Sequence, residues 1–200
     1  MKKILIICLL LTAASFAQVN FEIYTGANFP IGNKPFSNFL SINYYPGINL
    51  GVSADYSIFN IFAVSPFAEY SYFFFKNYNS GTPGFQGNLV SASGTNSQFY
   101  RLGLNLKYFP SFLSLSHGYV LTGFSWNGVN AGSININWYD PGKGTTRTSE
   151  QIDNSHYVAQ SFGIGLGIAK FRYFMVMIEG VITTDYSDRL LGSVNLGFYF

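Results

Sequence analysis

The sequence predicts an all-β fold, a closed antiparallel transmembrane up-and-down β-barrel of about eight strands, preceded by a cleavable signal peptide. Three observations lead to this prediction: the composition, repeated segments of alternating apolar and polar residues, and connections whose lengths alternate. Of the 200 residues, 10% are charged and 19% are aromatic, whereas about a quarter of a soluble domain is charged. Apolar strands facing lipid around a polar interior would produce this composition.

Residues 1–17 have the pattern of a secretory signal peptide. Basic residues come first, an apolar stretch runs from Ile4 to Ala14, and Ser15-Phe16-Ala17 provides small residues for cleavage. The apolar stretch is shorter than the roughly 20 residues that a membrane-spanning helix needs. We therefore expect cleavage after Ala17, leaving residues 18–200 as the barrel domain. The only cysteine, Cys8, lies in this leader, so the mature domain is expected to have no thiol chemistry.

The first four predicted strands cover residues 19–28, 46–57, 62–76 and 98–109. In the first, second and fourth, every other residue is apolar, as on a strand with two different faces. Phe21 and Ile23, for example, alternate with Asn20 and Glu22. The third alternates loosely and contains Pro66, which cannot donate a ladder hydrogen bond. We expect that strand to begin after Pro66 or to carry a bulge.

The last four predicted strands cover residues 118–127, 156–169, 171–184 and 189–200. The first of these is apolar on both faces and is placed by its length and position. The next carries glycine and alanine on one face, which suits a narrow lumen where small residues make room for large ones. The last is the clearest, because Val194, Leu196 and Phe198 alternate with Asn195 and Gly197.

The connections between these segments alternate in length, as in barrels with long outer loops and short inner turns. Residues 29–45, 77–97 and 128–155 form long connections, and only the fourth outer one, 185–188, is short. The inner connections are 58–61, 110–117 and the turn at Lys170. Within the third long loop, Ile134, Ile136 and Trp138 alternate with asparagines. This segment predicts either a hairpin arm beyond the membrane or two further strands of a ten-stranded barrel.

The leader, the eight alternating segments and the ending Leu196-Gly197-Phe198-Tyr199-Phe200 resemble small bacterial outer-membrane barrels of the OmpA/OmpX-like, eight-stranded kind. The resemblance covers the whole mature chain, but it is a pattern without a specific motif. It implies the outer membrane of a Gram-negative bacterium, with both termini in the periplasm. It also implies contact with outer-membrane lipids, and recognition of the last strand, ending in Phe200, by the barrel-assembly machinery.

Six charged residues fall on faces that we expect to point inward: Glu22, Asp55, Glu69, Arg101, Lys107 and Glu179. An eight-stranded barrel is filled by side chains and leaves no open channel. Buried charges are tolerated when they are paired, so we expect an interior ion-pair network here. The alternative is a polar or proton-coupled path through the barrel.

No catalytic, cofactor-binding or metal site is predicted. A serine nucleophile needs a histidine within reach, yet no serine stands two positions from His117 or His156, and the neighbouring serines face the opposite side. Weak calcium binding by loop acids remains open, at positions Asp140, Glu150, Asp153, Asp185 and Asp188. The alternating Gly163, Gly165 and Gly167 do not predict a nucleotide loop, because no helix follows them.

Aromatic residues cluster at 72–75, at Trp138-Tyr139 and at 171–174, and we interpret these clusters as interfacial belts. The nearly neutral mature chain argues against a nucleic-acid partner. We therefore expect a barrel without enzymatic activity that displays loops 77–97 and 128–155 for adhesion, envelope integrity or partner binding. Three alternatives stay open: a lipid-modifying barrel enzyme, a component of an envelope secretion or assembly machine, and a soluble β-sandwich or lipocalin-like carrier.

Overall fold

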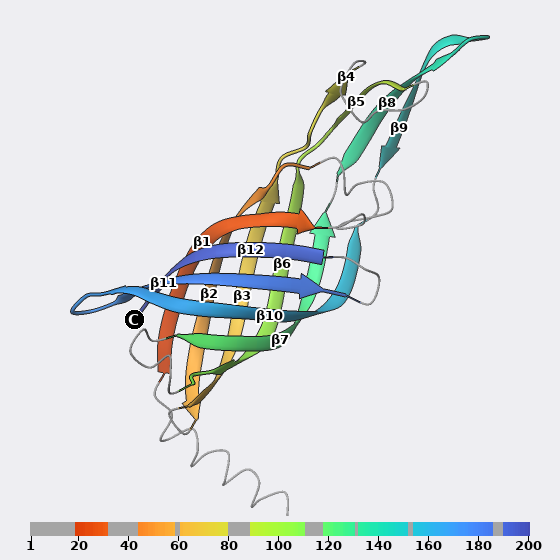
Figure 1. Ribbon diagram of the computed structural model, residues 1–200. Coiled ribbons are helices and arrows are strands. Elements are labelled where there is room, and N and C mark those ends of the chain that lie inside the picture. The colour runs from red at the N-terminus through yellow and green to blue at the C-terminus, as the bar shows by residue number, and fades with distance from the viewer. Residues whose placement is uncertain are drawn as a thin grey trace, which may run out of the picture.

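The computed structural model contains a closed barrel of eight antiparallel strands (Figure 1). It describes residues 19–31, 44–58, 61–79, 89–110, 118–130, 132–151, 154–185 and 190–200. The barrel strands are β1 (Val19–Ile31), β2 (Gly47–Ile58), β3 (Phe62–Phe73), β6 (Ser97–Tyr108), β7 (Tyr119–Asn130), β10 (Ser155–Lys170), β11 (Met175–Thr184) and β12 (Leu190–Tyr199). Each pairs with its neighbours along the chain, and β1 closes the barrel against β12. The predicted eight-stranded architecture is confirmed, while the expected signal peptide, residues 1–17, lies outside the described residues.

The two faces of the barrel wall differ as the alternation predicts. On β2, Ile48, Leu50 and Val52 point outward and are at least half exposed, whereas Asn49 and Ser53 are buried in the lumen. The same alternation holds along β3, where the sequence pattern was weak. An apolar outer wall around a polar interior is the reverse of a water-soluble protein and suits a protein that spans a bilayer through its strands. Among the described residues, no helix is long and apolar enough to cross a membrane.

Pro66 lies inside β3, so the prediction that the strand begins after it or bulges there is wrong. Pro66 pairs with Leu104 of β6 in an unbroken register. On the β2 side, the ladder is interrupted opposite Ala54 and Asp55 but continues in the same register. Pro66 is exposed on the outer wall. The missing N–H therefore costs the barrel only a local gap in one ladder.

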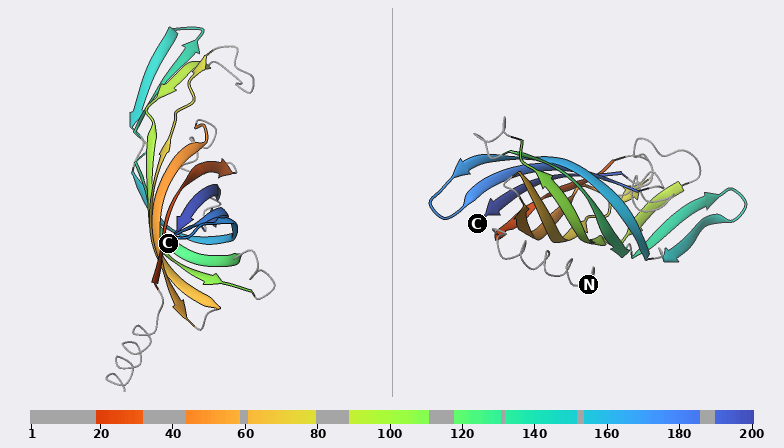
Figure 2. Two further views of the ribbon diagram at one scale, coloured as in Figure 1. Left: turned by 90° about the vertical axis from the view of Figure 1, so that its left-hand side faces the viewer. Right: turned by 90° about the horizontal axis from the view of Figure 1, so that it is seen from below.

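A second, four-stranded sheet projects from one end of the barrel (Figures 1 and 2). We call it the arm. It consists of β4 (Tyr78–Asn79), β5 (Leu89–Gly94), β8 (Ser133–Asp140) and β9 (Gly144–Gln151), in the order β4-β5-β8-β9. The predicted hairpin arm is confirmed, and the ten-stranded barrel is wrong because β8 and β9 pair outside the barrel. The expectation that residues 77–97 form only a connection is wrong where β4 and β5 lie.

The arm leaves the barrel where β6 and β7 stop pairing with each other. At this junction the backbone N–H of Thr95 donates to the carbonyl oxygen of Ser133 (3.0 Å), and the N–H of Ser133 donates to Thr95 Oγ1 (2.9 Å). Gly132 between them has φ of 71°, which favours glycine. A Cβ atom at Gly132 would collide with the Thr95 side chain. The chain thus redirects from barrel to arm at a position that only glycine fits.

At the opposite end, the turn between β10 and β11 spans residues 171–174, rather than lying at Lys170 as expected. Its closing hydrogen bond runs from the N–H of Phe171 to the carbonyl oxygen of Phe174 (2.8 Å). Phe174 also contacts Phe198 and Phe200, with ring centroids 5.9 and 6.1 Å away. The aromatic cluster at 171–174 therefore lies at the rim of the barrel, as an interfacial belt requires.

Candidate functional site

The lumen of the barrel holds all six charged side chains that the alternation placed inside, and all six are buried. The nearby glycines make room for large neighbours. A Cβ at Gly51 would overlap the ring of Tyr24, and one at Gly165 would overlap the ring of Tyr119. The alternation of small and large residues thus fills the lumen with side chains, as in other small barrels.

The lower part of the lumen, away from the arm, is organised around Lys107. Its Nζ lies 3.0 Å from Glu22 Oε2 and 3.0 Å from Asp55 Oδ2. It also lies 4.6 Å from the centre of the Tyr119 ring, within range of a cation–π interaction. Because Lys107 is only 1% exposed, its charge is compensated by these groups in place of water.

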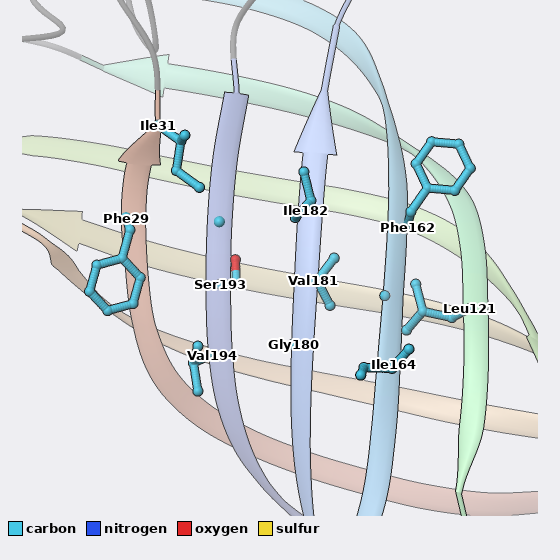
Figure 3. Close-up of a pocket in the computed structure, with 12 residues that line it drawn as sticks. Phe29, Ile31, Leu121, Phe162, Ile164, Gly180, Val181, Ile182, Ser193 and Val194 are labelled. Carbon is cyan, nitrogen blue, oxygen red and sulfur yellow. The ribbon is translucent and has the colours of Figure 1, made fainter.

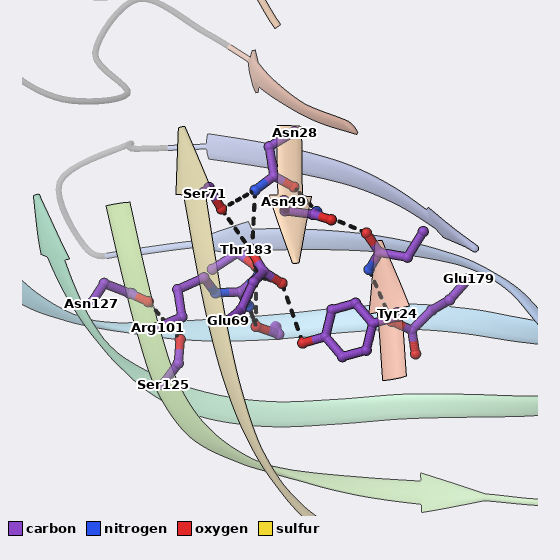
Figure 4. A network of polar contacts seen from close by, with 12 residues as sticks. Tyr24, Asn28, Asn49, Glu69, Ser71, Arg101, Ser125, Asn127, Glu179 and Thr183 are labelled. Carbon is purple, nitrogen blue, oxygen red and sulfur yellow. Dashed lines mark hydrogen bonds and ion pairs between the residues drawn. The ribbon is translucent and has the colours of Figure 1, made fainter. Parts of the chain in front are cut away.

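Arg101 and Glu69 form the second ion pair, with Nη1 and Oε2 3.4 Å apart. Polar side chains surround this pair (Figure 4). Arg101 Nη2 donates to Ser161 Oγ at 3.1 Å and to Thr183 Oγ1 at 3.0 Å. Asn28 Nδ2 donates to Glu69 Oε1 at 3.1 Å. The prediction of an interior ion-pair network is confirmed for these five of the six charges: Glu22, Asp55, Glu69, Arg101 and Lys107.

Glu179 is the exception, because no cation of the described chain lies within ion-pair distance of it. The Tyr119 hydroxyl donates to Glu179 Oε2 at 2.6 Å, and Asn195 Nδ2 donates to Oε1 at 3.3 Å. Sequence reasoning treated Glu179 like the other charges, because alternation shows which face a residue takes but not which strands bring partners to it. Within the described residues, no group of three acidic, histidine or cysteine side chains could hold a metal ion.

A hydrophobic cluster closes the end of the lumen next to the arm. It contains Tyr44, Phe73, Phe75, Phe99, Val129, Ile134, Ile136 and Leu191. Ile134 and Ile136 belong to β8, while Phe73, Phe99 and Val129 belong to barrel strands. One face of the arm is therefore buried against the top of the barrel. Burial raises the pKa of the Tyr44 hydroxyl to about 12, because the phenolate would lose its hydration there.

Of the two histidines weighed for a lipid-modifying enzyme, the structure describes His156. His156 is exposed on the outer wall and stacks on Trp126, with ring centroids 5.0 Å apart and planes 7° apart. Tyr100 lies beside both rings. This is the environment of an interfacial aromatic cluster. His117 lies outside the described residues, and so do Asp153 and Asp188 of the weak calcium hypothesis.

No protein-family model and no curated protein matches this chain. Among solved structures, a major outer membrane protein from Thermus thermophilus matches with 14% identity, 92% of this chain and 99% of that chain covered, and a TM-score of 0.49. The N-terminal β-barrel domain of Pseudomonas aeruginosa OprF matches with 12% identity and a TM-score of 0.41, and the match covers 92% of this chain and 99% of that one. Ail, the attachment invasion locus protein of Yersinia pestis, in complex with the heparin analogue sucrose octasulfate, matches with 9% identity and a TM-score of 0.43. That match covers 92% of this chain and 97% of Ail.

The chain resembles small outer-membrane barrels. At these identities and TM-scores, no ligand or activity transfers from those proteins to this one. Beyond the barrel, the chain carries the arm, whose tip has exposed aromatic side chains. Trp138 is 37% exposed and Tyr139 is 51% exposed. The interpretation of Trp138-Tyr139 as part of a membrane belt is therefore wrong, because β8 lies in the arm and not in the barrel wall.

Proposed function

We propose that this protein is a non-enzymatic barrel of the Gram-negative outer membrane whose arm binds a protein partner outside the cell. The observation that carries the proposal is the difference in burial between residues at the base and at the tip of the arm. Ile134 and Ile136 are buried against the barrel, whereas Trp138 and Tyr139 at the tip remain exposed. Tryptophan and tyrosine are enriched among residues that dominate protein interfaces.

The outer edge of the arm offers a second means of binding. Among the described strands, β9 pairs only with β8, so the backbone groups along its other edge are open to an added strand. Thr145, Thr146 and Thr148 are exposed on β9, and no proline blocks it. Natural edge strands are usually protected by charges, bulges or proline. Here the only basic side chain on β9 is Arg147.

In this proposal the arm is extracellular. The opposite end of the barrel, which carries the 171–174 turn and Phe200, faces the periplasm. This orientation follows the rule that long connections lie outside and short turns inside. A protease added to intact cells should then cut the arm and leave the barrel strands intact. Cleavage that requires a broken outer membrane would contradict this orientation.

Partner binding is tested by placing a photoreactive benzoylphenylalanine in place of Tyr139 or Thr148 on intact cells of the native organism. Illumination should yield a discrete protein adduct from both arm positions. The matched control replaces Tyr70, an exposed aromatic residue of the barrel wall, which should give no protein adduct. Absence of an adduct from both arm positions, or an equal adduct from Tyr70, would overturn the proposal.

A further inference from the structure

β9 is the one long strand in the described part of the chain that has a partner strand on only one side. It covers Gly144–Gln151 and pairs with β8 along one edge (Figure 1). Every strand of the closed barrel pairs on both sides, and the strand at the other edge of the arm, β4, is only Tyr78–Asn79. A further strand that joins the described structure would therefore find space for a full ladder along β9.

Exposed side chains have different surroundings on the barrel and on the arm. On the barrel wall, apolar side chains such as Phe162 and Ile182, which border a shallow hollow over Gly180 (Figure 3), face lipid. Residues 145–149 of β9 are exposed on both faces of the arm, and all of them are polar. Most of them are threonines, which favour strands, and Thr–Thr pairs between strands are stabilising. The open edge of β9 thus suits a strand of similar character.

A second copy of the chain offers such a strand in its own β9. Two identical strands that pair antiparallel are related by a twofold axis, and directly opposite residues share a face. One residue must then lie opposite its own copy, because a shift by one position would set opposite faces against each other. With Arg147 at the axis, two guanidinium groups would meet, and like charges placed opposite each other are destabilising. With Thr148 at the axis, an overlap of the same length, over residues 145–151, places Arg147 opposite Ser149. The charge of Arg147 therefore favours the Thr148 register.

The direction of β9 decides where the second copy lies. Gly144 pairs with Asp140 at the tip of the arm, and Gln151 pairs with Ser133 beside the junction with the barrel. β9 therefore runs from the tip back toward the barrel (Figure 1). In two copies that share one membrane, both arms point away from it and their β9 strands run in the same sense. An antiparallel second copy has its tip toward this barrel, so its own barrel lies beyond the tip of this arm. Antiparallel pairing therefore joins two membranes that face each other.

We propose that the arm pairs with the arm of a second copy of this chain on a neighbouring cell, β9 against β9, with Thr148 opposite Thr148. The joined sheet has the strand order β4-β5-β8-β9-β9-β8-β5-β4. The inference rests on the proposed function, because it takes the arm to be extracellular and names its protein partner. One such contact is small, but many copies on two facing surfaces bind together and gain avidity. The protein thus holds cells of its own kind together.

Cell clustering tests this pairing with the full-length chain. Two populations of a Gram-negative host make the chain, one with a red and one with a green fluorescent protein inside, and microscopy counts mixed-colour clusters. Wild-type chains should produce such clusters. Thr148→Lys in both populations, or Thr148→Glu in both, should reduce them at least about threefold, because like charges directly opposite each other destabilise a strand pair. Mixing cells that carry Thr148→Lys with cells that carry Thr148→Glu should restore the clusters. The matched control Thr145→Lys lies opposite Gln151 in this register and should leave clustering unchanged.

Disulfide formation tests the register itself. Cα atoms of directly opposite residues are about 4.5–5.5 Å apart, which a disulfide can span. The only cysteine of the chain, Cys8, lies in the expected signal peptide. Thr148→Cys in two differently tagged populations should therefore give a disulfide between the two tags under mild oxidation, and Thr145→Cys should give none.

Wild-type cells that form no mixed clusters would overturn the inference, as would clusters that survive both Thr148→Lys and Thr148→Glu. Loss of clusters in both variants without recovery in the mixture would overturn the second copy as the partner. A benzoylphenylalanine adduct from the Thr148 position with a different protein would do so too, but it would leave the proposed function standing. A disulfide confined to chains of one population would overturn the contact between cells. The heat-dependent gel shift and the protease digestion of intact cells show that each variant is folded and displayed.

Discussion

Replacing Lys107 with methionine should be among the most damaging single changes in the lumen. The substitution keeps much of the side chain's length but removes the charge that lies 3.0 Å from both Glu22 and Asp55. Two carboxylates would then be left in a site where Glu22 is 4% exposed and Asp55 is 0% exposed. Removing one partner of a buried ion pair destabilises a protein by about 3–5 kcal/mol. With a urea dependence of roughly 1–3 kcal/mol per molar, the unfolding midpoint should fall by at least about 1 M.

The assay is equilibrium unfolding by urea in lipid vesicles, followed by the gel shift between the folded and the boiled barrel. Two variants control it. Lys170→Met removes an exposed lysine at the end of β10 and should change the midpoint little. The triple variant Lys107→Met, Glu22→Gln, Asp55→Asn removes all three charges and should recover most of the stability. A loss below about 1 kcal/mol for Lys107→Met, typical of a solvated ion pair, would show that water and not Lys107 compensates the two carboxylates.

Three further predictions concern packing and titration. Gly51→Val should destabilise the barrel by about 1–3 kcal/mol, as overpacking does, because a Cβ atom there overlaps the Tyr24 ring. Urea unfolding of this variant is compared with that of the control Ala54→Val, which changes the outer wall of the same strand. Ile136 is 3% exposed, so Ile136→Ala should destabilise the arm by about 2–5 kcal/mol. Proteolysis of the arm on intact cells should become faster while the barrel's gel shift stays the same. Proteolysis at the same rate as in the wild-type protein would show that β8 is not anchored. For Tyr44, the pKa is about 12 in the folded state against about 10 when unfolded. The free energy of folding that the neutral Tyr44 hydroxyl contributes is therefore complete below about pH 10 and is lost as the pH rises to about 12. The tyrosinate absorbance of Tyr44→Phe should therefore lack one group that titrates near pH 12, and a missing group near pH 10 would contradict the burial of Tyr44.

The barrel could be predicted from the sequence because a wall with lipid on one side and side chains on the other imposes a strict two-residue period. Thus Glu22, Asp55 and Lys107 were placed in the lumen correctly. Pro66 misled the prediction, because a proline was taken to end or distort a strand, whereas the ladder tolerates a missing donor on one side. The alternation of apolar and polar residues along the sequence does not show where a ladder lacks a hydrogen bond.

The partners of each charge, and the strands β4 and β5 that complete the arm, could not be predicted in the same way. The contact between Lys107 and Glu22 joins residues 85 positions apart, and alternation says nothing of register between distant strands. The arm depends on β5 pairing with β8, from two different loops. Residues 91–96 are rich in serine, glycine and asparagine, so local preference indicated a loop. Pairing with β8 and the burial of Ala92 overrode that preference.

The barrel wall turns its apolar face outward, toward lipid, and its polar face into the lumen. Cys8 is the only cysteine of the chain, so single cysteines can be placed along β11 from Val176 to Thr183 and labelled with a spin probe in outer-membrane vesicles. Accessibility to molecular oxygen, which concentrates in hydrocarbon, should alternate, with maxima at 178 and 182 and minima at 177, 179, 181 and 183. Oxygen accessibility without a two-residue period, or maxima at the odd positions, would contradict the claim.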